Sequence, residues 1–229
     1  MIIEGLQKLT LLDYPGKAAC TVFLHGCNYR CPFCHNASLV TRRNETSLSL
    51  NELGAFFEKR KHILDGVCVT GGEALLDKDI AQLLAFCKSF GFSVKLDTNG
   101  SFPDKLEALI SEGLVDYVAM DIKSSPERYA LACGVKDYDV TPVMKSVELL
   151  MNGKTEYEFR TTVVRELHTN EDLISIGKWI TGARAYFLQQ FTDSGDLISG
   201  GLSAYSKDEM HALAQAVRVY VPAVAVRGV

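Results

Sequence analysis

Short runs of apolar and β-branched residues alternate along this chain with longer segments in which apolar positions recur at helical spacing. The runs predict strands, and the longer segments predict helices. Two helical segments open with a serine followed three positions later by glutamate, Ser49 with Glu52 and Ser206 with Glu209. That spacing is typical of a capping box at a helix N-terminus. The predicted strands are residues 18–24, 66–70, 93–98, 117–121, 158–164 and 186–190.

The alternation of strands and helices indicates an α/β fold of parallel units joined by right-handed crossovers. Six units are too few for a closed eight-stranded barrel, so they fit a partial barrel or an open doubly wound sheet. In both architectures functional side chains gather at the C-terminal ends of the strands. No repeat or linker divides the chain. We therefore expect a single domain over residues 1–229, with a lead-in at 1–17 and a loop, helix and strand-like segment at 192–229.

The composition is that of a soluble globular protein, with 47% hydrophobic and 23% charged residues among 229. The net charge of −4 provides no basic surface for nucleic acid or an anionic membrane. No apolar run is long enough to span a bilayer, and the N-terminus has no basic and apolar regions of a secretory signal. We therefore expect a cytoplasmic protein with neither nucleic acid nor membrane as partner.

Three of the seven cysteines, Cys27, Cys31 and Cys34, lie within eight residues directly after the first predicted strand. An odd count with this crowding does not fit a disulfide framework, and a metal site is the first interpretation. Iron–sulfur cubes usually take four cysteine ligands. A cube held by these three leaves one iron open, which is typical of a catalytic rather than a structural metal site.

A structural zinc site made from the same three cysteines and His35 is the alternative, although no C-x-x-C or H-x-x-H pair elsewhere supports it. Unliganded thiols are a further alternative. The remaining four cysteines are scattered singly, so a second cluster is not expected. Those in a predicted strand and a predicted helix are expected in the core, and one other is considered as a neighbour of the cluster. These are Cys68 and Cys87 for the core, Cys20 near the cluster, and Cys133.

Polar residues follow the second, third and fourth predicted strands at their ends. The second ends in Gly71-Gly72-Glu73, where the two glycines allow a ligand close to the backbone, although Gly-Gly also forms ordinary turns. The third ends in Asp97-Thr98-Asn99-Gly100 and the fourth in Asp121-Ile122-Lys123. Carboxylates at two neighbouring strand ends are expected to need a cation, or a salt bridge such as Asp121 with Lys123.

One arginine, Arg160, lies inside an otherwise apolar predicted strand. A buried guanidinium needs an anionic partner. That partner is either the carboxylate of a ligand or an acidic side chain such as Asp121. At the end of the sixth strand, Gln189 and Gln190 are placed either to contact a ligand or simply to give the rim its polarity.

Together these motifs resemble the radical S-adenosylmethionine (SAM) superfamily, including Phe33 before the third cysteine and His35-Asn36 after it. The resemblance implies a partial (β/α)6 barrel of the TIM type. It also implies a [4Fe–4S] cluster on Cys27, Cys31 and Cys34, whose open iron is chelated by the amino and carboxylate groups of SAM. Phe33 would then lie near the adenine, with ordinary loop packing as its alternative.

The same resemblance implies further roles for the residues at the strand ends. Gly71, Gly72 and Glu73 would hold the methionyl amino group of SAM. The activating enzymes of glycyl radical enzymes have a similar Asp-Thr-Asn-Gly and Asp-x-Lys pattern, which implies a monovalent cation on Asp97, Thr98 and Asp121. The other implied contacts to SAM are Asp97, Asn99, Lys123, Arg160 and Gln190.

Within the superfamily, residues 12–17, 25–28 and 187–191 resemble the longer activating proteins of anaerobic ribonucleoside-triphosphate reductase. This implies a glycyl radical enzyme as partner and reduced flavodoxin or ferredoxin as electron donor. Two alternatives stay open: an activase of pyruvate formate-lyase or another glycyl radical enzyme, and a radical SAM enzyme that acts on a small molecule. Residues 192–205 are expected either to admit a substrate loop or close as a lid, or to form a passive loop.

Overall fold

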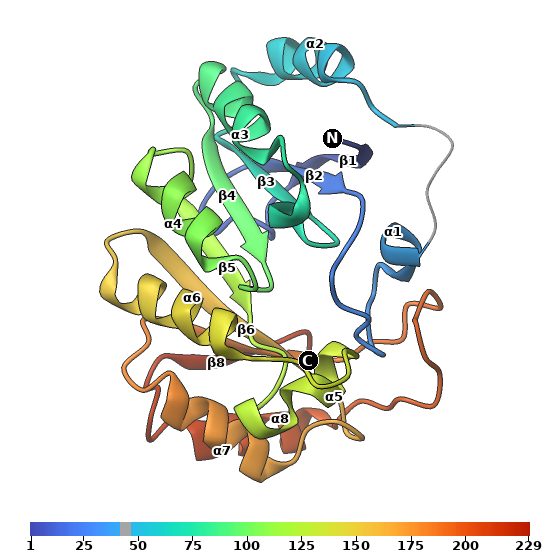
Figure 1. Ribbon diagram of the computed structural model, residues 1–229, viewed down its shortest axis with the longest axis vertical. Helices are drawn as coiled ribbons and strands as arrows, with labels where there is room; N and C mark the ends of the chain where they lie inside the picture. The colour runs from blue at the N-terminus through green and yellow to red at the C-terminus, as the bar shows by residue number, and fades with distance from the viewer. Residues whose placement is uncertain (42–46) are drawn as a thin grey trace. The chain divides into compact units, whose positions relative to one another are not determined.

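The computed structural model describes residues 1–41 and 47–229 (Figure 1). The protein has an α/β fold whose eight strands follow one another in the sheet in chain order, from β1 to β8. Its residues group into two compact units. The first comprises Met1–Asn28, Ser38–Thr98 and Asp104–Val118, and the second comprises Tyr29–Ala37, Asn99–Pro103 and Ala119–Val229.

The first unit contains four complete strands and the start of β5. β1 is antiparallel to β2, whereas β2, β3 and β4 are mutually parallel. The helix α3 packs against β4. The strands are β1 (Ile3–Thr10), β2 (Ala19–Leu24), β3 (Gly66–Gly71), β4 (Ser93–Thr98) and β5 (Tyr117–Asp121), and the helices are α1 (Ala37–Thr41), α2 (Leu50–Arg60), η1 (Ala74–Leu76), α3 (Ile80–Ser89) and α4 (Pro103–Ser111).

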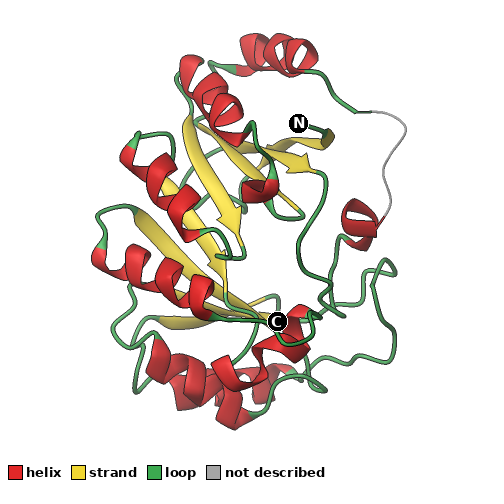
Figure 2. Ribbon diagram, in the orientation of Figure 1, coloured by secondary structure: helices red, strands yellow, loops and turns green. Residues whose placement is uncertain are grey.

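The second unit contains three further parallel strands. Helices lie outside the strands, with α7 beside α8 and α8 packed on β7 and β8 (Figure 2). The strands are β6 (Glu156–Val163), β7 (Tyr186–Gln190) and β8 (Val224–Arg227), and the helices are η2 (Pro126–Arg128), α5 (Tyr129–Cys133), α6 (Thr141–Asn152), α7 (Asn170–Trp179) and α8 (Lys207–Val217).

All six strands predicted from the hydrophobic pattern are present, with ends displaced by at most two residues. Both predicted capping boxes are confirmed: Ser49 and Ser206 each accept a hydrogen bond from the backbone N–H of the glutamate three positions on. A third box, from Thr169 to Asp172, caps α7 and was not predicted. Local capping chemistry therefore sets several helix starts in this chain.

Strand β1 was not predicted as a strand. Its sequence mixes Glu4, Gly5, Gln7 and Lys8 with apolar residues, and its burial does not alternate. The strand forms because it pairs antiparallel with β2. Pairing with a partner strand is a tertiary contact, so a local pattern cannot reveal it.

The parallel strands of the first unit are buried on both faces, as continuous apolar runs require. One polar row interrupts this core. Thr21 on β2 is in register with Cys68 on β3, and Cys68 is in register with Lys95 on β4. All three are almost completely shielded from solvent. This row leads along β4 to the strand-end residues of the candidate site.

In the part of the chain that the structure describes, no helix combines the length and apolar character needed to cross a membrane.

Candidate functional site

The three-cysteine loop begins two residues after the end of β2 and contributes to both units: Cys27 belongs to the first, and Cys31 and Cys34 to the second. Cys31 is buried, with 7% of its surface exposed, whereas Cys27 and Cys34 are half-buried. The Cys34 N–H donates to the Cys31 carbonyl at 3.0 Å, closing a tight turn between them. None of the three is joined in a disulfide, and cysteine thiolates are the usual ligands of iron–sulfur clusters.

In the first unit, the Gly-Gly-Glu motif at the end of β3 is joined to the start of the cysteine loop by the backbone. The Glu73 N–H donates to the Gly26 carbonyl at 2.8 Å, and the Gly72 N–H donates to the Leu24 carbonyl at 3.1 Å. A Cβ on residue 72 would lie 1.9 Å from the Gly26 oxygen and 3.1 Å from Cβ of Cys27. Only glycine fits there, so Gly72 sets the position from which the loop departs.

The side chain of Glu73 is buried, with 1% exposed. Its Oε1 accepts hydrogen bonds from the Leu75 N–H at 3.0 Å and from the Thr98 hydroxyl at 2.8 Å. These contacts tie the end of β3 to the end of β4 within the first unit. Two predicted site residues, Glu73 and Thr98, are therefore brought together, a contact that the sequence analysis did not anticipate.

Asp97 has a partner that the sequence analysis missed. The ammonium of Lys95, which is 1% exposed, forms an ion pair with the Asp97 carboxylate. The Cys68 sulfur lies 3.6 Å from both Lys95 Nζ and Asp97 Oδ1. Residues two apart on a strand share a face of the sheet, so the i, i+2 spacing of Lys95 and Asp97 was a usable signal.

A close contact between two side chains precedes the cysteine loop and was also missed. His25 Nδ1 lies 2.5 Å from Oε1 of Glu4, whose side chain is buried. His25 is two residues before Cys27, and the backbone N–H of His25 donates to the Ile2 carbonyl at 3.2 Å. Ile2 and Glu4, at the start of the chain, thus hold the residue that leads into the loop.

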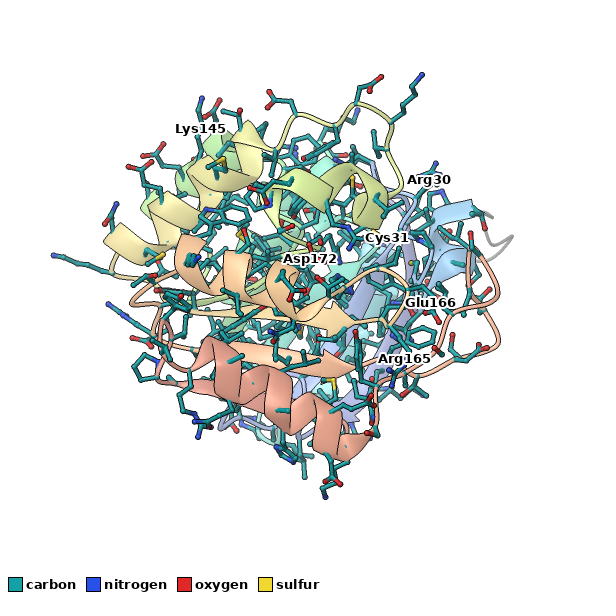
Figure 3. The ribbon with its side chains drawn as sticks, turned by 90° about the horizontal axis from the view of Figure 1, so that it is seen from below. Arg30, Cys31, Lys145, Arg165, Glu166 and Asp172 are labelled. Carbon is teal, nitrogen blue, oxygen red and sulfur yellow. The ribbon has the colours of Figure 1, made fainter. Side chains whose placement is uncertain are left out.

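In the second unit, the cysteine loop (Arg30 and Cys31 are labelled in Figure 3) is held by segments distant in the sequence. The Arg30 N–H donates to the Cys133 carbonyl at 2.9 Å, and the Ser199 N–H donates to the Pro32 carbonyl at 3.0 Å. The Ala37 N–H adds a bond of 3.4 Å to the Asp196 carbonyl. Residues 192–205 therefore bond to the loop that carries Cys31 and Cys34.

Phe33 is buried in the second unit, where its ring meets the ring of His168 edge-on at 6.1 Å between centroids. The Val164 N–H donates to His168 Nδ1 at 3.0 Å, which leaves the proton on Nε2, 2.7 Å from the Lys123 carbonyl. Burial lowers the pKa of His168, in keeping with this neutral form. His168, which the sequence analysis missed, thus links Phe33 to the backbone of Lys123.

Asp121, Lys123 and Arg160 form one cluster in the second unit. Arg160 Nε donates to Asp121 Oδ1 at 2.9 Å, and Lys123 Nζ donates to Oδ2 at 3.1 Å. Burial opposes ionisation of Asp121, but the charges of Arg160 and Lys123 outweigh it and lower the pKa of Asp121 to about 2. The sequence left a ligand carboxylate or an acidic side chain open as the partner of Arg160. In the structure Arg160 is paired with the acidic side chain, that of Asp121.

Asn99 and Gln190 also belong to the second unit, where Asn99 bonds within the loop after β4 and Gln190, the last residue of β7, bonds to the segment that follows that strand. Asn99 Oδ1 accepts from the Ser101 N–H at 3.0 Å, and Gln190 Nε2 donates to the Tyr205 carbonyl at 2.6 Å. These bonds define the loops after β4 and β7. Contacts of either side chain with a cofactor stay predictions.

Across residues 1–41 and 47–229, no three histidine, cysteine, aspartate or glutamate side chains are grouped so as to hold a single metal ion. The zinc alternative would require such a group. A four-iron cluster does not, because each cysteine binds a different iron. Three cysteines within eight residues of one loop, none of them in a disulfide and with Gly72 close to Cys27, fit a cluster ligated at three of its irons.

An α/β fold with a three-cysteine loop after its first parallel strand defines a class of iron–sulfur enzymes. The sequence model of the radical SAM superfamily matches residues 21–180, and the chain belongs to this superfamily. Membership implies a [4Fe–4S] cluster and SAM as cofactors. The resemblance seen in the motifs is thereby confirmed.

Comparison with other proteins gives further relatives. A Methanocaldococcus jannaschii protein, itself only proposed to be a glycyl-radical enzyme activating enzyme, is 31% identical over 99% of this chain and 95% of its own. The pyruvate formate-lyase-activating enzyme of Streptococcus mutans is 25% identical over 78% of this chain and 72% of its own. The fold is similar to that of a radical SAM methyltransferase from Sphaerobacter thermophilus, with a TM-score of 0.75 at 12% identity, covering 96% of this chain and 68% of that one.

Proposed function

We propose that this protein activates a glycyl radical enzyme, and that the partner is anaerobic ribonucleoside-triphosphate reductase. The observation that carries the activase proposal is the match to the M. jannaschii protein along almost the whole of both chains. The similarity to a pyruvate formate-lyase-activating enzyme supports the same class. The finer choice of partner rests on the motifs at residues 12–17, 25–28 and 187–191.

When bound, the [4Fe–4S] cluster supplies one electron, taken from reduced flavodoxin or ferredoxin, for the reductive cleavage of SAM. The overall reaction removes one hydrogen atom from a glycine of the partner and releases methionine and 5′-deoxyadenosine. Cys27, Cys31 and Cys34 would hold the cluster. The tasks of this chain are to bind, to orient and to exclude water.

The cluster of charges in the second unit is suited to orienting a ligand carboxylate. Arg160 and Lys123 carry two positive charges against the single negative charge of Asp121. The surplus charge would attract the SAM carboxylate, and Asp121 would keep both cations in place. Phe33, fixed by His168, would provide a flat apolar surface for the adenine.

The segment 192–205 would exclude water from the cysteine loop. It bonds to the loop backbone at Pro32 and Ala37, and Ser203 is anchored by Glu166, which follows β6 (Figure 3), with the Ser203 N–H 2.9 Å from Glu166 Oε2. We propose that this segment is a lid that opens for the glycine-bearing loop of the partner.

The proposal is tested first without the partner. Anaerobically reconstituted protein is assayed for iron and sulfide, and for 5′-deoxyadenosine formed from SAM with dithionite. We expect about four irons per chain and SAM cleavage, both lost in Cys31→Ala. Cys87→Ala is the matched control, because Cys87 is buried inside α3 and should retain both.

The second stage adds anaerobic ribonucleotide reductase and measures a glycyl radical by electron paramagnetic resonance. A radical that requires SAM, reductant and the intact protein supports the proposed partner. SAM cleavage without a radical on this enzyme, but with one on pyruvate formate-lyase, would reassign the partner. Cleavage stimulated only by a small molecule would contradict the activase proposal altogether.

A further inference from the structure

The family resemblance implies a monovalent metal cation between Asp97, Thr98 and Asp121, yet each carboxylate already has a positively charged neighbour from this chain. In the second unit, Asp121 is paired with Arg160 and Lys123. In the first unit, Asp97 is paired with Lys95. The cations differ in exposure: the side chain of Lys95 is 1% exposed, against 17% for Lys123 and 14% for Arg160. The buried cation at Asp97 therefore bears most directly on whether a metal ion is needed there.

Lys95 is unusual for a lysine because its side chain is 1% exposed. It lies on β4 within the polar row that includes Cys68, and its chain neighbours Val94 and Leu96 are fully buried. An ammonium group removed from water must have an anionic partner close by. Asp97, with 15% of its side chain exposed, lies two residues further along the same face and supplies that partner.

This pairing leaves no need for a metal cation at Asp97. The oxygen that receives the ammonium, Oδ1, also lies 3.6 Å from the Cys68 sulfur. A potassium or sodium ion beside the same carboxylate would be repelled by an ammonium that is buried and cannot move into solvent. The neighbouring Thr98 hydroxyl, a second predicted ligand, donates a hydrogen bond to Glu73 Oε1 at 2.8 Å.

We propose that the Lys95 ammonium is the fixed cation of Asp97 and takes the place of a bound potassium or sodium ion at the end of β4. Lys95 is thus a positioning residue that holds the Asp97 carboxylate at the end of β4. The inference concerns the cofactor site of the radical SAM fold. It does not depend on which partner the enzyme activates.

The test uses the full chain without cluster, and compares melting temperatures in potassium, sodium, ammonium and choline chloride at equal ionic strength. In the wild-type protein the four salts should agree within about 1 °C, because Lys95 already neutralises Asp97. In Lys95→Ala, a small cation can enter the space that the side chain leaves. A cation present at about ten times its dissociation constant would raise the melting temperature of this variant by about 3–5 °C relative to choline.

Lys88→Ala is the matched control. Lys88 also pairs with an aspartate of the first unit, Asp116, at 2.6 Å, but both side chains are partly exposed. Water replaces the lost ammonium there, so no preference for potassium or ammonium over choline is expected. A cation response in Lys95→Ala that Lys88→Ala lacks would establish that Asp97 needs a positive charge rather than a particular packing.

Two results would overturn the proposal. One is a wild-type protein that potassium or sodium stabilises by about 3 °C over choline, with the effect abolished in Asp97→Asn, which would place a metal ion at Asp97. The other is a folded Lys95→Ala that responds to cations no more than Lys88→Ala. If Lys95→Ala does not fold, the comparison of the wild type with Asp97→Asn decides alone. No readout requires cluster or partner, so this proposal can fail separately from the proposed function.

Discussion

Replacing Gly72 by alanine tests whether the cysteine loop is held by close backbone contact with the end of β3. The added Cβ would lie 1.9 Å from the Gly26 oxygen, 2.5 Å from the Gly26 carbonyl carbon and 3.1 Å from Cβ of Cys27. The first two atoms are backbone, so no rotation of a side chain relieves the contact. Either β3 or the start of the cysteine loop must move.

The expected cost follows from two contributions. Forcing an extra carbon into a packed site costs about 1–3 kcal/mol. The shift also stretches the hydrogen bond from the Glu73 N–H to the Gly26 carbonyl, now 2.8 Å long, which contributes about 1 kcal/mol. For a chain of this size, a total of about 2–4 kcal/mol lowers the melting temperature by about 4–16 °C.

The assay is thermal unfolding of the cluster-free protein, followed by iron content after anaerobic reconstitution. Gly200→Ala is the control, because nothing lies within 4 Å of the added Cβ and no positive φ is needed there. We expect Gly72→Ala to melt lower and to retain less iron, because Cys27 is displaced. A Gly72→Ala protein that matches Gly200→Ala within about 2 °C and binds full iron would refute the close contact.

Two further predictions concern the second unit. The pKa of Asp121 is lowered to about 2, below its unfolded value, so its ionised form stabilises the fold above about pH 4, and this contribution disappears as the pH falls through about 2. In urea unfolding, the difference between the wild type and Asp121→Asn should therefore be constant near neutral pH and shrink in acid; a pH-independent difference would contradict the pairing. Ser146→Ala removes a buried bond of 2.7 Å to the Gly100 carbonyl and should cost about 1–2 kcal/mol in chemical unfolding. Ser89→Ala removes an exposed bond of equal length to the Phe86 carbonyl and should cost less than about 0.5 kcal/mol, so equal losses would be the contrary result.

The sequence by itself determined the order and type of most elements. Hydrophobic periodicity located six strands, and the serine–glutamate spacing located two helix starts. It also indicated a metal site, since three cysteines within eight residues stay close by covalent connection alone, and the motifs together gave the resemblance that implies the [4Fe–4S] cluster. Such features depend on neighbours along the chain, and local patterns report them faithfully.

Only the tertiary structure decided which charges meet and what holds the loop. Asp121 pairs with Arg160, 39 positions further along the chain. The Ser199 N–H donates to the Pro32 carbonyl, which is even more distant in the sequence. Strand β1 exists through its pairing with β2. The spacing of Lys95 and Asp97 places them on one face of β4, but only the burial of Lys95 shows that its ammonium needs an anionic partner. Burial and long-range pairing are properties of the folded chain, and they decide which of the candidate residues contact one another.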